Sequence, residues 1–215
     1  MHLLYSNILR TLFILCCIYG MTDECEEKYK YIYNLTKPYK FIQLTQILLL
    51  LLIFLHSISV FEINIPVEFR SFMKYLRKVL MVNALGISFC VFLGYWSLYL
   101  SDPENVVVKE LVALGYRPSL LKNNAQHTLP FLFALYEAFQ IEGDPNLCIL
   151  LIPSSVIYYL FSFYFYKLSG RWQYGIFDNL GNSARIIFFI EFTILSMFYV
   201  YLIHTIKHHI SIKYS

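Results

Sequence analysis

The chain has 215 residues, of which 58% are hydrophobic and 14% charged, with a net charge of +3 and a mean hydropathy of +0.56. That apolar content exceeds what a soluble domain needs, and no basic block of the kind that binds nucleic acid is present. Because a membrane crossing takes about 20 residues, this length allows several crossings joined by short loops. We therefore expect an all-α, polytopic membrane helix bundle with no nucleic-acid partner.

Six apolar stretches predict about six transmembrane helices in a single integral-membrane domain that covers residues 1–215. They lie roughly at residues 3–20, 41–61, 79–100, 127–140, 147–166 and 185–204. The first stretch has the length of a signal peptide, but Arg10 lies in its middle and Ile18-Tyr19-Gly20 is a poor cleavage site. We interpret it as a retained helix.

The cysteines and histidines do not form a metal-binding pattern. The five cysteines contain no CxxC spacing, so we expect neither a disulfide framework nor a metal site, and no cofactor is implied. His204 and His208 are four residues apart, but no further ligand accompanies them, and we interpret them as part of a solvated basic tail. The sequon Asn34-Leu35-Thr36 lies close to the next apolar stretch, and we expect no glycan there.

Polar side chains inside apolar stretches are the first candidates for function, because their burial in lipid is costly. His56, Glu137 and Glu191 are such intramembrane candidates. Hydrogen bonding between helices is the alternative interpretation of His56, and Glu191 should be protonated, paired or facing water. Glu137 follows His127 by ten residues, about 15 Å along a helix, so we expect it toward the opposite leaflet.

The segment Asn123 to Pro130 delivers His127 to the start of an apolar stretch, while Thr45 heads the longest aliphatic run. The sequence has no GxSxG elbow, HExxH helix, phosphate loop or dinucleotide fingerprint. A hydroxyl on one membrane helix and an imidazole on another are the minimum set for nucleophilic acyl transfer in lipid. We treat Thr45 and His127 as candidate catalytic residues, with structural packing as the alternative.

Four stretches, in their order and spacing, resemble the androgen-induced gene family. They are Tyr39-Lys40-Phe41-Ile42, the segment from Tyr95-Trp96 to Lys109, Asn123 to Thr128 followed by Glu137, and Trp172-Gln173-Tyr174 followed by Ser183 to Phe189. The resemblance implies a multipass membrane threonine hydrolase that cleaves fatty acid esters of hydroxy fatty acids. It also implies cytosolic termini, a location in the endoplasmic reticulum or plasma membrane, and a lipid as substrate or ligand. His127 matches the family's catalytic histidine.

The family's catalytic threonine has no direct match. In ungapped register Gln43 stands at that place, and Thr45 lies two residues on, about 200° around a helix. Thr45 would reach the same place only if the helix entrance were bulged or unwound. Gln43, Asn123 and Gln126 are candidates to bind substrate or donate hydrogen bonds to an oxyanion.

Three functions stay open from the sequence. The first is a membrane lipid-ester hydrolase that uses Thr45 and His127. The second is a catalytically lapsed relative that binds a lipid and acts through partners. The third is a small transporter or channel, which His56, Glu137 and Glu191 favour and the absence of internal repeats opposes. An inward-facing Thr45 favours the hydrolase over the lapsed relative.

Overall fold

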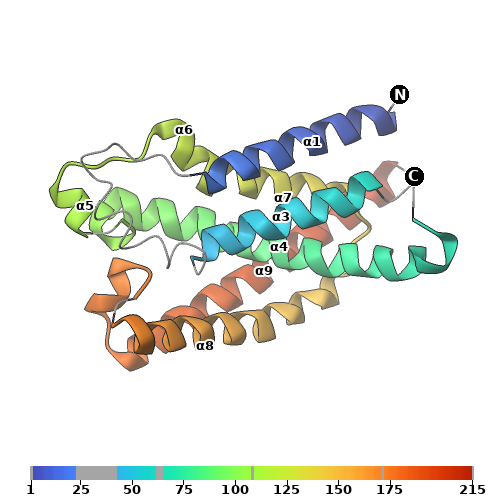
Figure 1. The fold of residues 1–215 in the computed structure, drawn as a ribbon. Helices are drawn as coiled ribbons and strands as arrows, with labels where there is room; N and C mark the ends of the chain where they lie inside the picture. The colour runs from blue at the N-terminus through green and yellow to red at the C-terminus, as the bar shows by residue number, and fades with distance from the viewer. Residues whose placement is uncertain (1, 23–42, 62–64, 108, 171, 215) are drawn as a thin grey trace.

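The computed structural model describes residues 2–22, 43–61, 65–107, 109–170 and 172–214, and these residues form helices and connecting loops without a strand. Six helices are the main elements: α1 (His2–Met21), α3 (Leu44–Phe61), α4 (Val67–Ser101), α7 (Leu129–Gln140), α8 (Leu151–Ser169) and α9 (Asn182–Tyr214). Short helical turns join them: η4 (Pro103–Asn105), α5 (Lys109–Ala113), α6 (Leu120–Asn123), η5 (Asn124–Thr128), η6 (Pro145–Leu150) and η7 (Gly175–Asn179). The main helices run roughly along one axis, with both termini at one end (Figure 1).

Among the described residues, five segments are long and apolar enough to cross a membrane: Leu4–Met21, Leu44–Phe61, Val67–Ser101, Pro145–Ser169 and Asn182–Ile210. The expected fourth span, residues 127–140, is not among them, because the π-helical turn η5 interrupts the α-helix there and leaves 12 residues to α7. It continues α6 and η5 without a break, so that residues 120–140 are helical throughout. The all-α, polytopic bundle is confirmed.

Two helices are longer than the sequence pattern indicated. We expected residues 62–78 to be a loop, but α4 begins at Val67, directly after Pro66 and with Glu68 in its first turn, where an acidic side chain favours a helix start. Its 35 residues measure about 52 Å, so its first turns extend past a bilayer core. The helix α9 has 33 residues and is also long, because it continues past residue 204, where the expected span ended, to Tyr214.

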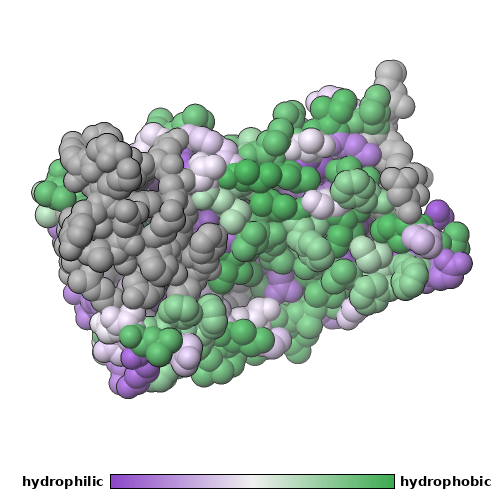
Figure 2. Space-filling model, in the orientation of Figure 1, coloured by the Kyte–Doolittle hydropathy of each residue, from purple (hydrophilic) through white to green (hydrophobic). Residues whose placement is uncertain are grey.

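The core forms around α3 and α4. The helix α3 packs against α1 and α4, and α4 in turn contacts α7 and α9, while α8 lies beside α9. The fully buried leucines of α3 and the side chains of α4 and α7 that they meet are the centre of this core: Leu48, Leu49, Leu52, Leu55, Met81, Val82, Leu85, Ala134 and Ala138. On the face shown in Figure 2, apolar side chains predominate in the middle of the bundle, and hydrophilic residues are more frequent toward its ends. This distribution is that of an integral multipass membrane protein.

Candidate functional site

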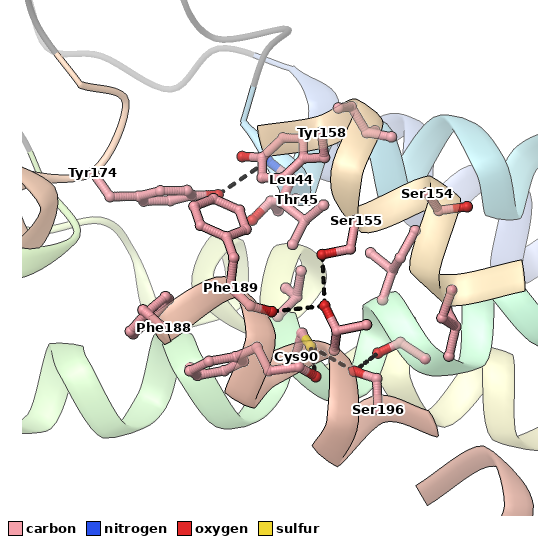
Figure 3. A pocket seen from close by; sticks show the side chains of 18 of the residues that line it. Leu44, Thr45, Cys90, Ser154, Ser155, Tyr158, Tyr174, Phe188, Phe189 and Ser196 are labelled. Atoms are coloured by element: carbon pink, nitrogen blue, oxygen red, sulfur yellow. Dashed lines mark hydrogen bonds between the residues drawn. The ribbon is translucent and has the colours of Figure 1, made fainter. Parts of the chain in front are cut away.

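An apolar cavity of about 430 Å³ lies between α3, α4, α8, α9 and η7. This size is typical of small-molecule sites, and most of the lining side chains are aliphatic or aromatic. Ten of the lining residues carry a polar group: Thr45, Asn83, Cys90, Tyr95, Ser154, Ser155, Tyr158, Tyr174, Thr193 and Ser196. Figure 3 shows Thr45, Tyr158 and Tyr174 together at one side of this cavity. The cavity suits a lipid chain with a small number of polar contacts.

Thr45 lies in the cavity wall because of where α3 begins. The Gln43 carbonyl accepts hydrogen bonds from the backbone N–H groups of Gln46 (2.9 Å) and Ile47 (3.2 Å), so Gln43 precedes the helix and Thr45 is its second residue. Thr45 is 5% exposed and lines the cavity, whereas Gln43 is half-buried and does not line it. The residues before Gln43, including Tyr39 to Ile42, lie outside the described part of the chain.

Tyr174, from the connector between α8 and α9, fixes the start of α3. Its hydroxyl accepts a hydrogen bond from the Leu44 N–H at 3.0 Å, and the Thr45 and Tyr158 side chains lie within hydrogen-bonding reach of it. Burial raises the pKa of Tyr174, so its hydroxyl keeps its proton and can donate it. The sequence motif contains Tyr174 but gave no sign that it contacts α3.

His127 lies behind Tyr95 rather than in the cavity wall. Its ring stacks on the Tyr95 ring with a centroid distance of 3.3 Å and an interplanar angle of 5°, and the residue is 7% exposed. Tyr95 itself lines the cavity. The His127 Nδ1 atom is buried without a hydrogen-bond partner, and no hydrogen bond joins His127 to Thr45 within the described segments. The imidazole is therefore near the cavity, with the Tyr95 ring against it.

The segment that carries His127 is a π-helical turn, Asn124–Thr128. The backbone N–H of Leu129 donates to the Asn124 carbonyl, five residues back, and Pro130, which has no N–H, follows directly. The Trp96 indole N–H donates to the Thr128 hydroxyl at 3.0 Å and ties the turn to α4. Such π-turns inside helices occur frequently at functional sites.

The three candidates for oxyanion contacts, Gln43, Asn123 and Gln126, lie outside the cavity wall. The Asn123 Oδ1 atom accepts from the Tyr95 hydroxyl at 2.8 Å, and the Gln126 Nε2 atom donates to the Gly20 carbonyl of α1 at 2.8 Å. As far as the described residues go, neither these two nor Gln43 lines the cavity. Asn123 acts on the cavity wall only through Tyr95.

The structure brings His56 and Glu137 together in a second polar cluster. Glu137 is fully buried and accepts hydrogen bonds from the Arg10 Nε and, at 3.3 Å, from the Arg10 Nη2; the His56 Nδ1 lies 3.3 Å from its Oε1. The Arg77 guanidinium lies 3.8 Å from the other Glu137 oxygen. Glu191, in contrast, is exposed on the outer surface of α9 and does not line the cavity.

The interpretation of His204 as part of a solvated tail is wrong. His204 is 4% exposed, because α9 stays packed on the bundle there and its ring covers the backbone at Gly143. His208, one turn on, is exposed. Within the described ranges, no group of three or more His, Cys, Asp or Glu residues is arranged to hold a metal ion.

A model of one protein family, described as FAR-17a/AIG1-like protein, matches residues 1–208. The chain belongs to this family. It is the androgen-induced gene family whose motifs the sequence resembles, and the match includes the residues that line the cavity and those of the Glu137 cluster. Comparisons with curated proteins and with solved structures give no match.

Proposed function

We propose that this FAR-17a/AIG1-like protein is a membrane lipid-ester hydrolase with Thr45 as its nucleophile. The observation that carries the proposal is the place of Thr45: its hydroxyl lies in the wall of an apolar cavity, beside Tyr174, at the end of an aliphatic transmembrane helix. A water-poor cavity suits an acyl chain, and a hydroxyl at its wall can attack an ester held there.

In this reaction the Thr45 Oγ1 atom attacks the ester carbonyl carbon and forms a new C–O bond. The bond to the leaving alcohol breaks, the alcohol departs with a proton, and the acyl group stays on Thr45 until water hydrolyses the new ester. The Thr45 proton needs an acceptor within about 3 Å or one water away. His127, whose Nδ1 has no partner, is the proposed base. Since the Tyr95 ring lies against His127, proton transfer requires this ring to turn or a water to pass it.

Tyr174 supports the attack from the other side. Because its hydroxyl accepts from the Leu44 N–H and keeps its own proton, it can donate to the oxyanion that forms on the substrate. Removal of one such donor typically lowers kcat by about 10²–10³-fold, which sets the size of the effect expected at this position.

A second candidate is a lipid-binding protein without turnover. Two observations favour it: the Tyr95 ring stacked on His127, and Gln43 at the position that matches the family's threonine. The cavity would then hold a lipid while the polar wall residues orient it.

The test measures hydrolysis of a fatty acid ester of a hydroxy fatty acid in membranes that contain equal amounts of each variant. The hydrolase proposal expects Thr45→Ala and His127→Ala to lose activity and Thr45→Ser to keep part of it. Thr11→Ala and His208→Ala are matched controls, since both residues are exposed and neither lines the cavity. If the wild type is inactive and Gln43→Thr is active, the lipid-binding candidate is correct.

A further inference from the structure

Helix packing closes the cavity on three sides but not between α3 and α8. Four of the described helices, α3, α4, α8 and α9, line the cavity. The helix α4 packs against α3 and against α9, and α9 packs against α8. The described parts of α3 and α8 do not pack closely against each other, although both line the cavity. The wall of the cavity is therefore weakest between these two helices.

The exposure of the lining side chains indicates the same side. Ile157 and Phe161 of α8 line the cavity, yet they are 66% and 45% exposed. The other described residues of the cavity wall are buried or half-buried. A side chain in a complete wall is covered by the neighbouring helix, so exposed lining residues mark the place where the wall is open.

The residues on the two sides of this opening are apolar and belong to membrane-spanning segments. On α3 they are Ile47 and Leu51, which are half-buried, and on α8 they are Ile157 and Phe161. We call these four residues the side opening. They lie within the spans Leu44–Phe61 and Pro145–Ser169, so in a membrane the side opening faces hydrocarbon and not water. A lipid chain is what lies against it.

The candidate nucleophile lies directly beside the side opening. Thr45 precedes Ile47 by two residues on α3, and Tyr158 follows Ile157 on α8. The Thr45 and Tyr158 side chains lie within hydrogen-bonding reach of the Tyr174 hydroxyl, and Figure 3 shows the three residues together at one side of the cavity. A chain that passes through the side opening therefore comes next to the Thr45 hydroxyl.

We propose that the side opening is the entrance of the cavity, through which an acyl chain of a bilayer lipid moves sideways from the hydrocarbon core. The inference deepens the proposed function and rests on it only for the role of Thr45, because a lipid-binding protein uses the same entrance. The acyl chain stays in apolar surroundings on this path, whereas a path through the end of the bundle would expose it to water. The rest of the lipid remains in the bilayer while one chain occupies the cavity.

The experiment measures how fast a fluorescent long-chain fatty acid enters and leaves the full chain in phosphatidylcholine vesicles, by energy transfer from the protein's two tryptophans. Leu51→Phe and Ile157→Phe each place a ring in the side opening. Because a narrowed passage slows movement in both directions, each variant should lower the entry and exit rates by about tenfold and leave the affinity within about twofold. Phe161→Ala, which removes a ring, should raise both rates.

Leu50→Phe and Leu160→Phe are the matched controls. Both residues are exposed, lie on the same two helices and do not line the cavity. They should leave both rates unchanged. An affinity that falls with only the exit rate altered in Leu51→Phe or Ile157→Phe would make these residues part of the binding wall and would overturn the proposal.

Three further outcomes are decisive. Slower rates in Ile176→Phe, with unchanged rates in the two side-opening variants, would place the entrance at the η7 end and overturn the proposal. Rates that rise when the protein is diluted with lipid would show that a second copy covers the side opening, and would overturn it as well. If the rates depend on the side opening while no ester is hydrolysed, the entrance stands and the proposed hydrolase does not.

Discussion

Replacement of Glu137 by alanine should strongly destabilise the bundle. Glu137 is fully buried, and Arg10, which is 5% exposed, donates hydrogen bonds to both oxygens of this carboxylate. Without the carboxylate, the Arg10 guanidinium stays between α1 and α7 as an unpaired charge. Loss of one partner from a buried ion pair costs about 3–5 kcal/mol.

Glu137→Gln should cost less than Glu137→Ala, because the amide oxygen still accepts from Arg10, although the charge is lost. The double variant Arg10→Met, Glu137→Met should recover most of the stability, since both members of the close ion pair are removed together and methionine fills a similar volume. The free energy of unfolding of the purified variants would be compared by denaturant titration in detergent, as a double-mutant cycle.

Two outcomes would refute this reasoning. Wild-type stability in Glu137→Ala would show that Arg10 finds water or a lipid phosphate instead. A double variant as unstable as Glu137→Ala would show that the loss comes from packing and not from the unpaired charge.

Four further predictions address the cavity and the helix ends. Tyr174→Phe should reduce ester hydrolysis by about 10²-fold or more while the protein stays folded, measured as kcat in membranes, because the Leu44 N–H and Thr45 lose their partner. Val91→Phe, which places a ring in the cavity wall, should lower hydrolysis of long-chain esters by about tenfold or more and leave short-chain esters unaffected. Gly143→Ala would place a Cβ 2.0 Å from the His204 ring and should lower the free energy of unfolding by about 1–3 kcal/mol, measured by thermal unfolding. Gly181→Ala, whose Cβ would meet no atom within 4 Å, should leave the free energy of unfolding unchanged. Lys207→Met removes hydrogen bonds to the Ala138 (3.0 Å) and Ile141 (2.6 Å) carbonyls at the end of α7. It should lower the free energy of unfolding by about 1–3 kcal/mol in the same assay.

Hydropathy was enough to predict the fold class, because lipid requires each crossing segment to be apolar and helical. The helix ends were harder to predict. The start of α4 at Val67 follows from Pro66 in a stretch that reads as a charged loop, and the shortness of α7 follows from the π-turn before Pro130. Neither the proline nor the polar composition alone distinguishes a loop from a helix that extends past the bilayer.

The candidate site was only partly predictable for a different reason. The pairing of Arg10 with Glu137 joins residues 127 positions apart, and the bond from Leu44 to Tyr174 joins residues 130 positions apart. The inward position of Thr45 depends on the second of these contacts, since it fixes where α3 begins. Helical spacing from the family's motif predicted Thr45 on the opposite side of the helix from the family's threonine. That prediction could not take into account the contact that Tyr174, 130 positions further along the chain, makes with Leu44.

The most direct test of the central claim is to identify the residue that carries the acyl group during turnover. The full chain would be mixed with a long-chain ester, quenched in acid within the first turnovers, and digested for peptide mass spectrometry. The hydrolase proposal expects the acyl mass on Thr45, with greater accumulation in Tyr174→Phe if that change slows the release of the acyl group. An acyl group on Ser155 or another residue, or ester cleavage that continues in Thr45→Ala, would contradict it.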